Sequence, residues 1–456
     1  MQNKIEAFVR DIGTTGDAIL SLEAPDQPDI DGRIAFADGL VPGDRVLVHK
    51  LAKAKKFLRV KEWELLQPSP SRTTPPCPIF GCCGGCDLQH LNYDATLAWK
   101  TKRVRDVLTR IGKLDNTDEL VQDCLACEPA KAYRSRVQLK VQWGDENEPQ
   151  IGFFEKNTHQ VIETEHCLIV SGFCNSLRKS WKNYLAELPT EEARNCVEIT
   201  WRENRDGDAF VIIFHLQDQA KVNEWQKAMS HLKDALKSNN AENCGIYLEH
   251  EGQIIPLQES EFTERFATEQ GEVKLLFSPL AFSQTNLWMD QTLYSEAVRM
   301  MKAASGEETV HDILELYCGS GSISAIMAKV FPEAKIEGVE IFAPAVEDAK
   351  KNAKVNGLSD RLDFVCADAG AYIKKREKAP QWLLVDPPRQ GLSKEATEDI
   401  LRLQAERICY ISCDPASLAR DLAILSQSYQ VQACQPLDMF PWTVHVETVV
   451  LMSKRA

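Results

Sequence analysis

The sequence predicts an α/β protein built from an N-terminal β-barrel, a central α+β domain and a C-terminal doubly wound sheet. Short strands separated by turn residues fill residues 1–68, and a mixed pattern of strands and helices follows. From about residue 278 onward strands alternate with helices, which is typical of a parallel sheet covered on both faces. At 456 residues the chain is also too long for one hydrophobic core. We therefore predict domains at 1–68, 69–275 and 276–456.

The N-terminal strands are EAFVRDI, GRIAF, RVLVHKL and FLRVKEWELL, with glycine and proline in the turns between them. A stretch rich in proline, serine and threonine, QPSPSRTTPP at 67–76, is the first linker. The central domain then offers strands such as SRVQLKV, CVEITW and AFVIIFHL. These patterns predict a small barrel followed by a separately packed sheet.

The net charge of −14 means that any contact with RNA must depend on local basic patches. Two stretches qualify, 49–61 and 100–105, although a solvated strand or helix face would look the same. No apolar run approaches the roughly 20 residues that a membrane span needs, and the first residues lack the apolar stretch of a signal peptide. We therefore expect a cytoplasmic protein, and we expect a monomer.

A glycine turn joins the first strand of the C-terminal domain, ILELY, to the helix ISAIMAKV. Gly319 and Gly321 permit a tight turn and close approach of the backbone to a ligand, although Ser324 replaces the third glycine of the dinucleotide fingerprint. Glu340 ends the next strand, where a carboxylate can bind both ribose hydroxyls, and Asp368 follows the third strand. This combination fits S-adenosylmethionine (SAM) better than a dinucleotide, because no pyrophosphate needs a cradle. An ordinary αβ unit with a glycine turn is the alternative.

The strand WLLVD runs into Asp386-Pro387-Pro388-Arg389. D-P-P at a strand end also occurs in methyltransferases that act on exocyclic amines, but there an aromatic residue that stacks on the base follows the prolines. Arg389 takes that place here, which argues against amine methylation and leaves a group suited to an RNA phosphate or a carboxylate. We assign Asp386 to the cofactor site.

The strand ICYIS leads into Cys413-Asp414-Pro415, and Asp and Pro are typical of a helix start. A thiol beside a helix N-terminus is expected to have a lowered pKa. Attack of such a thiolate on C6 of uracil makes C5 nucleophilic enough to take a methyl group, after which a base removes the C5 proton. A buried packing cysteine is the alternative, but the strand-end position favours a nucleophile. His445 and Glu447, just before or on the last strand, are candidates for the base, and either could equally be a structural polar residue.

Together these segments resemble the TRAM-domain RNA 5-methyluridine methyltransferases, which act on ribosomal RNA or on the T-loop of tRNA. FADGLVPGD (36–44) is similar to a turn in the family's OB-like TRAM barrel, and LYCGSGS matches the glycine loop of its Rossmann-like SAM methyltransferase domain. SCDPASLARD (412–421) and DMFPWTVHVE (438–447) are similar to the family's nucleophile and base segments. The resemblance spans essentially the whole chain, and the last two segments are its most specific part.

The resemblance implies roles for individual residues. It assigns the base to Glu447, and FSQTN at 282–286 looks like a family element that contacts SAM through Gln284. Asp414 stands where the family has Asn, and its charge beside Cys413 would oppose thiolate formation. The predicted cofactor contacts are Gln284, Tyr317, Gly319, Gly321, Ser322, Glu340, Asp368 and Asp386.

Fifteen cysteines in a chain without an export signal indicate metal or catalytic roles rather than disulfides. CPIFGCCGGC has the spacing of cysteine sets that hold an iron–sulfur cluster or zinc. Family members with this pattern carry a [4Fe–4S] cluster with a distant fourth cysteine, which EHCLIV would supply here. The radical-SAM spacing is absent, so we expect the cluster to be structural or RNA-facing. The expected ligands are Cys77, Cys83, Cys86 and Cys167, with Cys82, Cys124 and Cys127 outside the set.

Three other functions compete with this interpretation. A zinc-binding RNA-interaction protein with a degenerate methyltransferase domain would have lost the nucleophile or the base, whereas Cys413 and Glu447 are both present. The incomplete glycine fingerprint opposes an NAD-linked oxidoreductase, and an amine or ribose methyltransferase would not need Cys413. Family members with the four-cysteine set often act on large-subunit RNA, so we expect 23S rRNA as the substrate, with tRNA as the alternative.

Overall fold

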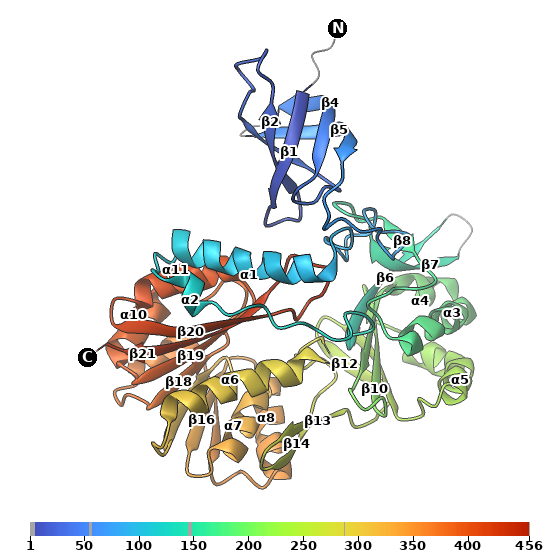
Figure 1. The fold of residues 1–456 in the computed structure, drawn as a ribbon. Helices are drawn as coiled ribbons and strands as arrows, with labels where there is room; N and C mark the ends of the chain where they lie inside the picture. Colours follow the sequence, from blue (N-terminus) through green and yellow to red (C-terminus); the bar gives the residue numbers. More distant parts are fainter. Residues whose placement is uncertain (1–4, 54–56, 145–147, 287, 456) are drawn as a thin grey trace. The chain divides into compact units, whose positions relative to one another are not determined.

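The computed structural model describes residues 5–53, 57–144, 148–286 and 288–455. The chain divides into two compact units, and each is considered by itself (Figure 1). None of the helices in the described ranges is long and apolar enough to cross a membrane. The first unit comprises Met1–Trp99, Phe154–Gln160 and Phe440–Val444, and the second comprises Lys100–Phe153, Val161–Met439 and His445–Ala456.

A closed five-stranded barrel with the strand order β1-β2-β3-β5-β4 forms the start of the first unit, as predicted. Side chains alternate along its strands, so that Ile5, Ala7 and Val9 of β1 point into the barrel core. Residues 54–56, which belong to the predicted basic stretch 49–61, lie outside the described residues. The strands are β1 (Ile5–Ile12), β2 (Ala18–Glu23), β3 (Ile34–Ala37), β4 (Arg45–Lys53) and β5 (Leu58–Gln67).

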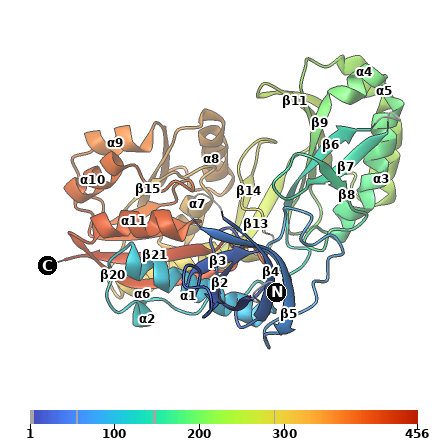
Figure 2. The same cartoon turned by 90° about the horizontal axis from the view of Figure 1, so that it is seen from above.

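A seven-stranded sheet with the order β12-β11-β10-β9-β6-β7-β8 forms the central part of the second unit. Helices α3 (Gly172–Glu187) and α5 (Val222–Ser238) contact each other and cover one face of this sheet (Figures 1 and 2). The core beneath them is aromatic, with Trp181, Trp201 and Trp225 fully buried. The strands are β6 (Arg136–Trp143), β7 (Pro149–Phe154), β8 (Val161–Glu163), β9 (Cys196–Glu203), β10 (Phe210–Leu216), β11 (Cys244–His250) and β12 (Gln253–Gln258).

A second seven-stranded sheet, with the order β17-β16-β15-β18-β19-β21-β20, occupies the C-terminal part of the second unit. Its first five strands are parallel, as the alternation of strands and helices predicts. Only β21 runs antiparallel, to its two neighbours β19 and β20, because β20 returns directly to β21 without a crossover helix. The strands are β15 (Asp312–Leu316), β16 (Lys335–Glu340), β17 (Leu362–Cys366), β18 (Trp382–Val385), β19 (Arg407–Ser412), β20 (Tyr429–Leu437) and β21 (Glu447–Lys454).

Two groups of helices accompany this sheet. Within one group α6 contacts α7 and α7 contacts α8, and within the other α10 contacts both α9 and α11 (Figures 1 and 2). The doubly wound arrangement leaves the carboxyl ends of the strands as the edge where a ligand can bind. The helices are α6 (Met289–Ser305), α7 (Ser322–Val330), α8 (Ala343–Val355), α9 (Ala369–Lys375), α10 (Lys394–Leu403) and α11 (Pro415–Leu425).

Two smaller pieces complete the second unit. The hairpin of β13 (Thr263–Thr268) and β14 (Gly271–Leu276) contacts α7 and α8. The segment from Val121 to Leu125 runs parallel to β20 through isolated bridges, so the outer edge of the C-terminal sheet is covered. The remaining helices are α1 (Tyr93–Arg110), α2 (Thr117–Leu120) and α4 (Thr190–Asn195).

Candidate active site

The glycine turn after β15 has an unusual backbone at three positions. Tyr317 adopts a positive φ of 64°, and its N–H donates to the Val339 carbonyl at 2.9 Å, which fixes the turn against β16. Gly319 also has a positive φ of 52°, and no atom lies within 4 Å of the position that a Cβ would take. At Gly321, in contrast, a Cβ would stand 2.7 Å from the Phe364 ring. One glycine therefore leaves open space and the other permits close packing.

The carboxylate of Glu340 lies directly beside this turn. Its Oε2 accepts a hydrogen bond from the Gly319 N–H at 3.1 Å, and its Oε1 accepts one from the Phe342 N–H at 2.8 Å. Glu340 is thus held at the end of β16, where a ribose-binding carboxylate is expected. Asp368 is exposed, and its side chain accepts a hydrogen bond from the Ala371 N–H at 2.8 Å as the N-cap of α9.

Three serines follow the glycine turn in different environments. Ser322, the first residue of α7, is partly exposed and can reach a ligand. Ser324 stands in the place of the third glycine, and its hydroxyl donates to the buried Glu315 carboxyl. The Ser320 hydroxyl is buried and has no hydrogen-bond partner within the described part of the chain. The turn can therefore accommodate a ligand, because it is open at Gly319 and has a polar group at Ser320 that is available for a hydrogen bond.

The FSQTN segment precedes α6 and is held from two sides. The Gln284 carbonyl accepts a hydrogen bond from Ser135 Oγ at 3.2 Å, and the Gln284 side chain shares a hydrogen bond with the Tyr294 hydroxyl. Asn286 is fully buried, and its Nδ2 donates to the Met439 carbonyl at 2.7 Å. The segment that carries Gln284 is therefore tied to the start of the segment that carries Glu447.

Cys413 follows β19 directly and is partly exposed. As predicted, Asp414 caps the next helix, because its Oδ1 accepts hydrogen bonds from the N–H groups of Ala416 at 3.0 Å and Ser417 at 2.8 Å. The thiol therefore stands at the junction of a strand end and the N-terminus of α11.

Glu447 is the first residue of β21, which pairs with β19 in antiparallel register. The last paired residues are Ser412 and Thr448, so continuing the same register places Cys413 opposite Glu447, in agreement with the effect of the Glu447 charge on the thiol pKa of Cys413. Glu447 is 4% exposed, which leaves its carboxyl without access to bulk water. The two residues that the sequence predicts as nucleophile and base are thus neighbours across two strands.

The thiol pKa departs from the prediction. Burial, together with the charges of Glu447 and Asp386, raises the pKa of Cys413 to about 12, although Arg389 opposes the shift. The lowering expected from the helix N-terminus is therefore wrong for the protein without RNA. The sequence points to Asp414 as the carboxylate that opposes ionisation of the thiol. In the structure this effect comes from Glu447 of β21 and from Asp386 in the turn after β18.

The carboxyl groups of the site have raised pKa values for the same reason. Burial raises the pKa of Glu447 to about 8, helped by the charge of Asp386 and opposed by Arg389. Burial alone raises the pKa of Asp386 to about 7. Groups with such values titrate near neutral pH and are suited to proton transfer.

Arg389 and His445 form a basic pair beside these acids. The Arg389 guanidinium lies 2.8 Å from His445 Nδ1 and 2.9 Å from Nε2. Burial lowers the pKa of His445 to about 4, and the charges of Arg389, Lys100 and Arg103 add to this effect. The imidazole is therefore neutral at pH 7. Arg103 and Lys100 come from the basic stretch 100–105 on α1.

Several supporting residues were missed by the sequence reasoning. Lys100 and Asp438 form a fully buried ion pair that anchors the segment leading to Glu447. Arg202 of β9 is fully buried beneath Phe262, with its guanidinium 4.5 Å from the ring centre. No sequence signal marks them, because each partner lies far away along the chain. Arg202 donates to the carbonyls of Ser278 (3.2 Å) and Pro279 (3.1 Å) and to Ser283 Oγ (3.0 Å).

The predicted cluster ligands are divided between the units. Cys77, Cys83 and Cys86 lie in one loop of the first unit, where the Gly85 N–H donates to Cys83 Sγ at 3.4 Å. Cys167 belongs to the second unit, and its N–H donates to Asn175 Oδ1 at 2.9 Å. Over the described ranges, no three His, Cys, Asp or Glu side chains form a group that could hold a metal ion.

Cys124 and Cys127 lie in and beside the segment that covers β20. Both are buried, and burial raises their thiol pKa values to about 12 and about 11. Cys127 contacts Asn286, whose Nδ2 lies 3.4 Å from its sulfur. These thiols contribute to packing in the second unit.

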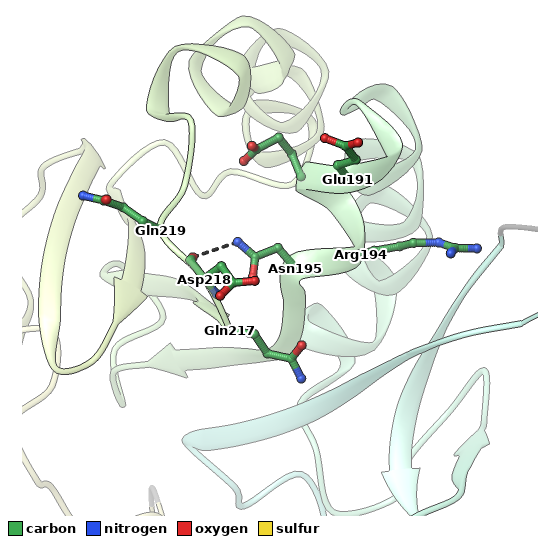
Figure 3. Close-up of a pocket in the computed structure, with 7 residues that line it drawn as sticks. Glu191, Arg194, Asn195, Gln217, Asp218 and Gln219 are labelled. Atoms are coloured by element: carbon green, nitrogen blue, oxygen red, sulfur yellow. Dashed lines mark hydrogen bonds between the residues drawn. The ribbon is translucent and has the colours of Figure 1, made fainter.

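Two of the hollows in the second unit differ in how they relate to the predicted site. One of about 500 Å³ adjoins the predicted cofactor site, because Tyr317 lines it together with Pro388 and Arg420. The other, of about 350 Å³, lies between the end of α4 and the residues after β10 (Figure 3). There Asn195 Nδ2 donates to the Asp218 carbonyl at 2.7 Å, and Glu191 and Arg194 point outward (Figure 3). None of its lining residues is part of the predicted site.

The chain is similar to known proteins over most of its length. The chain is 33% identical to a 23S rRNA (uracil(1939)-C(5))-methyltransferase of Shewanella halifaxensis, over 92% of this chain and 91% of that protein. It is also 33% identical to an uncharacterized RNA methyltransferase of Clostridium acetobutylicum, over 99% of this chain and 97% of that one.

A solved structure shares the fold over the same extent. The Pyrococcus abyssi tRNA (uracil-54, C5)-methyltransferase in complex with S-adenosyl-L-homocysteine matches with a TM-score of 0.73 at 22% identity. The match covers 98% of this chain and all of that one. The family model described as tRNA (uracil-5-)-methyltransferase matches residues 92–455. The chain therefore belongs to the tRNA (uracil-5-)-methyltransferase family and is a SAM-dependent RNA methyltransferase.

Proposed function

We propose that this enzyme forms 5-methyluridine in 23S rRNA, with Cys413 as the nucleophile and Glu447 as the base. The observation that carries the proposal is the register of β19 and β21, which brings the two residues opposite each other at a strand end. A thiol and a raised-pKa carboxyl at one place are what C5 methylation of uracil requires. The relative from Shewanella halifaxensis, which acts on 23S rRNA, supports the choice of RNA.

The reaction follows from these two groups. Once its thiol has lost its proton to solvent, the Cys413 thiolate bonds to C6 of the uracil, and the electrons of the C5–C6 double bond move onto the ring as an enolate. SAM supplies an electrophilic methyl group, which C5 takes as the carbon–sulfonium bond breaks. Glu447 then accepts the proton from C5, the C5–C6 double bond returns, and the bond between C6 and Cys413 breaks.

Charge around the site determines when Cys413 can react. With the pKa of its thiol raised to about 12, Cys413 is protonated in the enzyme without RNA. Because the charges of Glu447 and Asp386 oppose ionisation and Arg389 favours it, neutralising either carboxylate promotes the thiolate. We infer that the thiol ionises only in the loaded site, where the nucleophile meets its target.

The proposed SAM contacts surround the open side of the glycine turn. Glu340 is already oriented by the Gly319 N–H, and Gln284 is oriented by its neighbours Ser135 and Tyr294. These groups would bind and orient the cofactor, and Asp386 would face its positive charge. The full proposed set is Gln284, Tyr317, Gly319, Gly321, Ser322, Glu340, Asp368 and Asp386.

The nucleophile is tested with RNA that contains 5-fluorouridine, from which the base cannot remove fluorine. The wild type should form a protein–RNA adduct that survives denaturing electrophoresis. Cys413→Ala should form none and should lose turnover, while Cys82→Ala, which removes an exposed thiol of the first unit outside the proposed ligand set, should behave like the wild type. Robust turnover by Cys413→Ala would refute the assignment.

The substrate RNA is tested by mapping 5-methyluridine in rRNA and tRNA from cells with and without the gene. Loss of one 23S rRNA signal is expected. Loss from the tRNA T-loop alone would favour tRNA as the substrate instead. The tRNA alternative is supported by the description of the family model and by the activity named for the Pyrococcus abyssi enzyme. We expect the enzyme to act in the cytoplasm as a monomer, for which size-exclusion chromatography with light scattering is the test.

We also propose that Cys77, Cys83, Cys86 and Cys167 hold a [4Fe–4S] cluster. The spacing of the first three supports it, and an N–H group directed at Cys83 Sγ is typical of a cysteine that ligates such a cluster. We assign the cluster no step in methyl transfer. Anaerobically purified protein should contain about four irons per chain. Iron should fall on substitution of Cys83 and persist in Cys124→Ala, and stoichiometric zinc without iron would refute the proposal.

A further inference from the structure

Helix α8 and its C-cap present three polar side chains, Asp348, Asn352 and Asn356, to the edge of strand β14. Four residues along a helix rise about 6 Å, and two residues along a strand span about 6.7 Å, so the two repeats match. Successive side chains of this row therefore meet the backbone of alternate residues along β14 and just beyond it. The N–H groups of Ser278, Leu276 and Lys274 donate to Asp348 Oδ2 (2.7 Å), Asn352 Oδ1 (2.7 Å) and Asn356 Oδ1 (2.9 Å), respectively.

Asn352 makes one contact that the other two do not. Its Nδ2 donates to the Ser320 carbonyl at 2.9 Å as well as to the Leu276 carbonyl at 3.2 Å. Ser320 lies between Gly319 and Gly321 in the glycine turn. Because Asn352 is 1% exposed, water cannot replace these bonds when the side chain is removed. One side chain thus joins the glycine turn to β14.

Strand β14 leads into the other cofactor segment. Ser278 is fixed by two hydrogen bonds to Asp348, from its N–H and its hydroxyl, each 2.7 Å long. The chain then reaches Gln284 six residues later, with Arg202 holding the residues between. The glycine turn and the Gln284 segment are therefore both attached to α8.

We propose that Asn352 is a positioning residue for the SAM site, which sets the glycine turn relative to the Gln284 segment. The proposal rests on the cofactor contacts assigned under the proposed function. Without the Asn352 side chain the Ser320 carbonyl loses its partner and the turn can move relative to β14. Cofactor affinity should suffer, whereas the chemical step at Cys413 should not.

The test compares Asn352→Ala with Asn356→Ala, which loses a similar pair of bonds to β14 but none to the turn. Binding of S-adenosylhomocysteine is measured by calorimetry, and kcat and KM for SAM are measured with RNA in excess. We expect Asn352→Ala to raise the Kd and KM about three- to tenfold, as loss of one buried hydrogen bond implies, with kcat within about twofold. Asn356→Ala should keep the wild-type Kd although its melting temperature falls.

Equal weakening in both variants, or an unchanged Kd in Asn352→Ala, would overturn the inference. If the wild type itself bound no S-adenosylhomocysteine, the cofactor assignment would fail instead, so the two failures are distinguishable. Should Asn352→Ala not fold, amide exchange in the wild type decides. S-adenosylhomocysteine should slow exchange at residues 274–278 together with 318–322. Protection confined to 318–322 would contradict a link through Asn352.

Discussion

Replacing Glu447 by glutamine should trap the reaction after methyl transfer. Glutamine keeps the size and hydrogen-bonding capacity of the side chain, but it cannot accept the C5 proton. The adduct between Cys413 and the RNA can collapse only after that proton leaves. Glu447→Gln should therefore accumulate a methylated protein–RNA adduct on unmodified RNA. A general base contributes about 100- to 10,000-fold, and release should slow by that amount.

The pKa of about 8 for Glu447 determines the pH range of the effect. About one carboxyl in ten is ionised at pH 7 and about nine in ten at pH 9, since the ratio changes tenfold per pH unit. Proton removal by the wild type should accordingly rise about tenfold over this range, and the variant should lose the rise. Loss of the Glu447 charge also lowers the thiol pKa of Cys413, so adduct formation should not be slower.

The assay uses rapid mixing of enzyme, RNA and methyl-labelled SAM at pH 7, 8 and 9, followed by denaturing electrophoresis. The label should remain with the protein band in Glu447→Gln and pass to free RNA in the wild type. His445→Ala is the control, because its neutral imidazole is not the proposed base, and it should trap little adduct. Release of product by Glu447→Gln at the wild-type rate would mean that another residue or water removes the proton.

The same carboxyl affects folding stability. Its pKa is about 8 in the folded protein against an ordinary value of 4.5, so between these values the folded state holds a proton that the unfolded state has released. The free energy of unfolding therefore falls as pH rises through this window. Glutamine does not titrate. The melting temperature of Glu447→Gln should therefore rise relative to that of the wild type as the pH increases from 5 to 8. A constant difference would contradict the raised pKa.

Three further substitutions or ligands give separate predictions. Lys100→Met removes the ion-pair partner of the buried Asp438 carboxylate, and urea denaturation should show a loss of about 3–5 kcal/mol, largely recovered in the double variant Lys100→Met with Asp438→Leu. Arg202→Met should raise the Kd for S-adenosylhomocysteine, because residues 278–283 lose three hydrogen bonds, while Arg194→Met on the exposed end of α4 should not. Calorimetry in buffers of different ionisation enthalpy should show more proton release when SAM binds at pH 7.5 than when S-adenosylhomocysteine does. SAM carries a sulfonium charge that lowers the pKa of Asp386, and equal release would argue against that contact.

The strand ends could be predicted from the sequence because each combines an apolar run with the residues of a turn or helix start. Gly319, Glu340 and Asp414 stand where such patterns place them, and their local hydrogen bonds involve residues nearby in the chain or on the adjacent strand. The position of Glu447 relative to Cys413 could not be predicted in this way. It depends on the antiparallel pairing of β21 with β19, and the alternation of strands and helices gives no sign of that reversal.

The pKa of the Cys413 thiol is a second property that the sequence alone could not predict. A helix N-terminus is a local feature, so the sequence predicts a lowered pKa for Cys413. The carboxyls that raise it belong to Glu447 and Asp386, each more than 20 residues away, and burial is a property of the whole fold. The role of Asn352 could likewise not be predicted, because its partners Ser320 and Leu276 come together only when α8 packs beside β14.

The site also explains how a chain with a net charge of −14 can act on RNA. Burial raises the pKa of Glu315 and of Glu447, and the charge of Asp386 adds to both shifts, so ionisation of these acids together is unfavourable. A cation relieves that repulsion, which suits a cofactor with a sulfonium. Burial lowers the pKa of the neutral His445, and positive charges beside it lower it further. Among these, Arg389 is exposed and Arg103 is partly exposed, so both would be available to RNA phosphates. Arg389 affects both the acidic groups and the histidine, since its charge lowers the pKa of Cys413 and of Glu447 as well as that of His445. Separation of charge within the site, rather than the overall balance, therefore allows an acidic protein to bring a polyanion and a cationic methyl donor together.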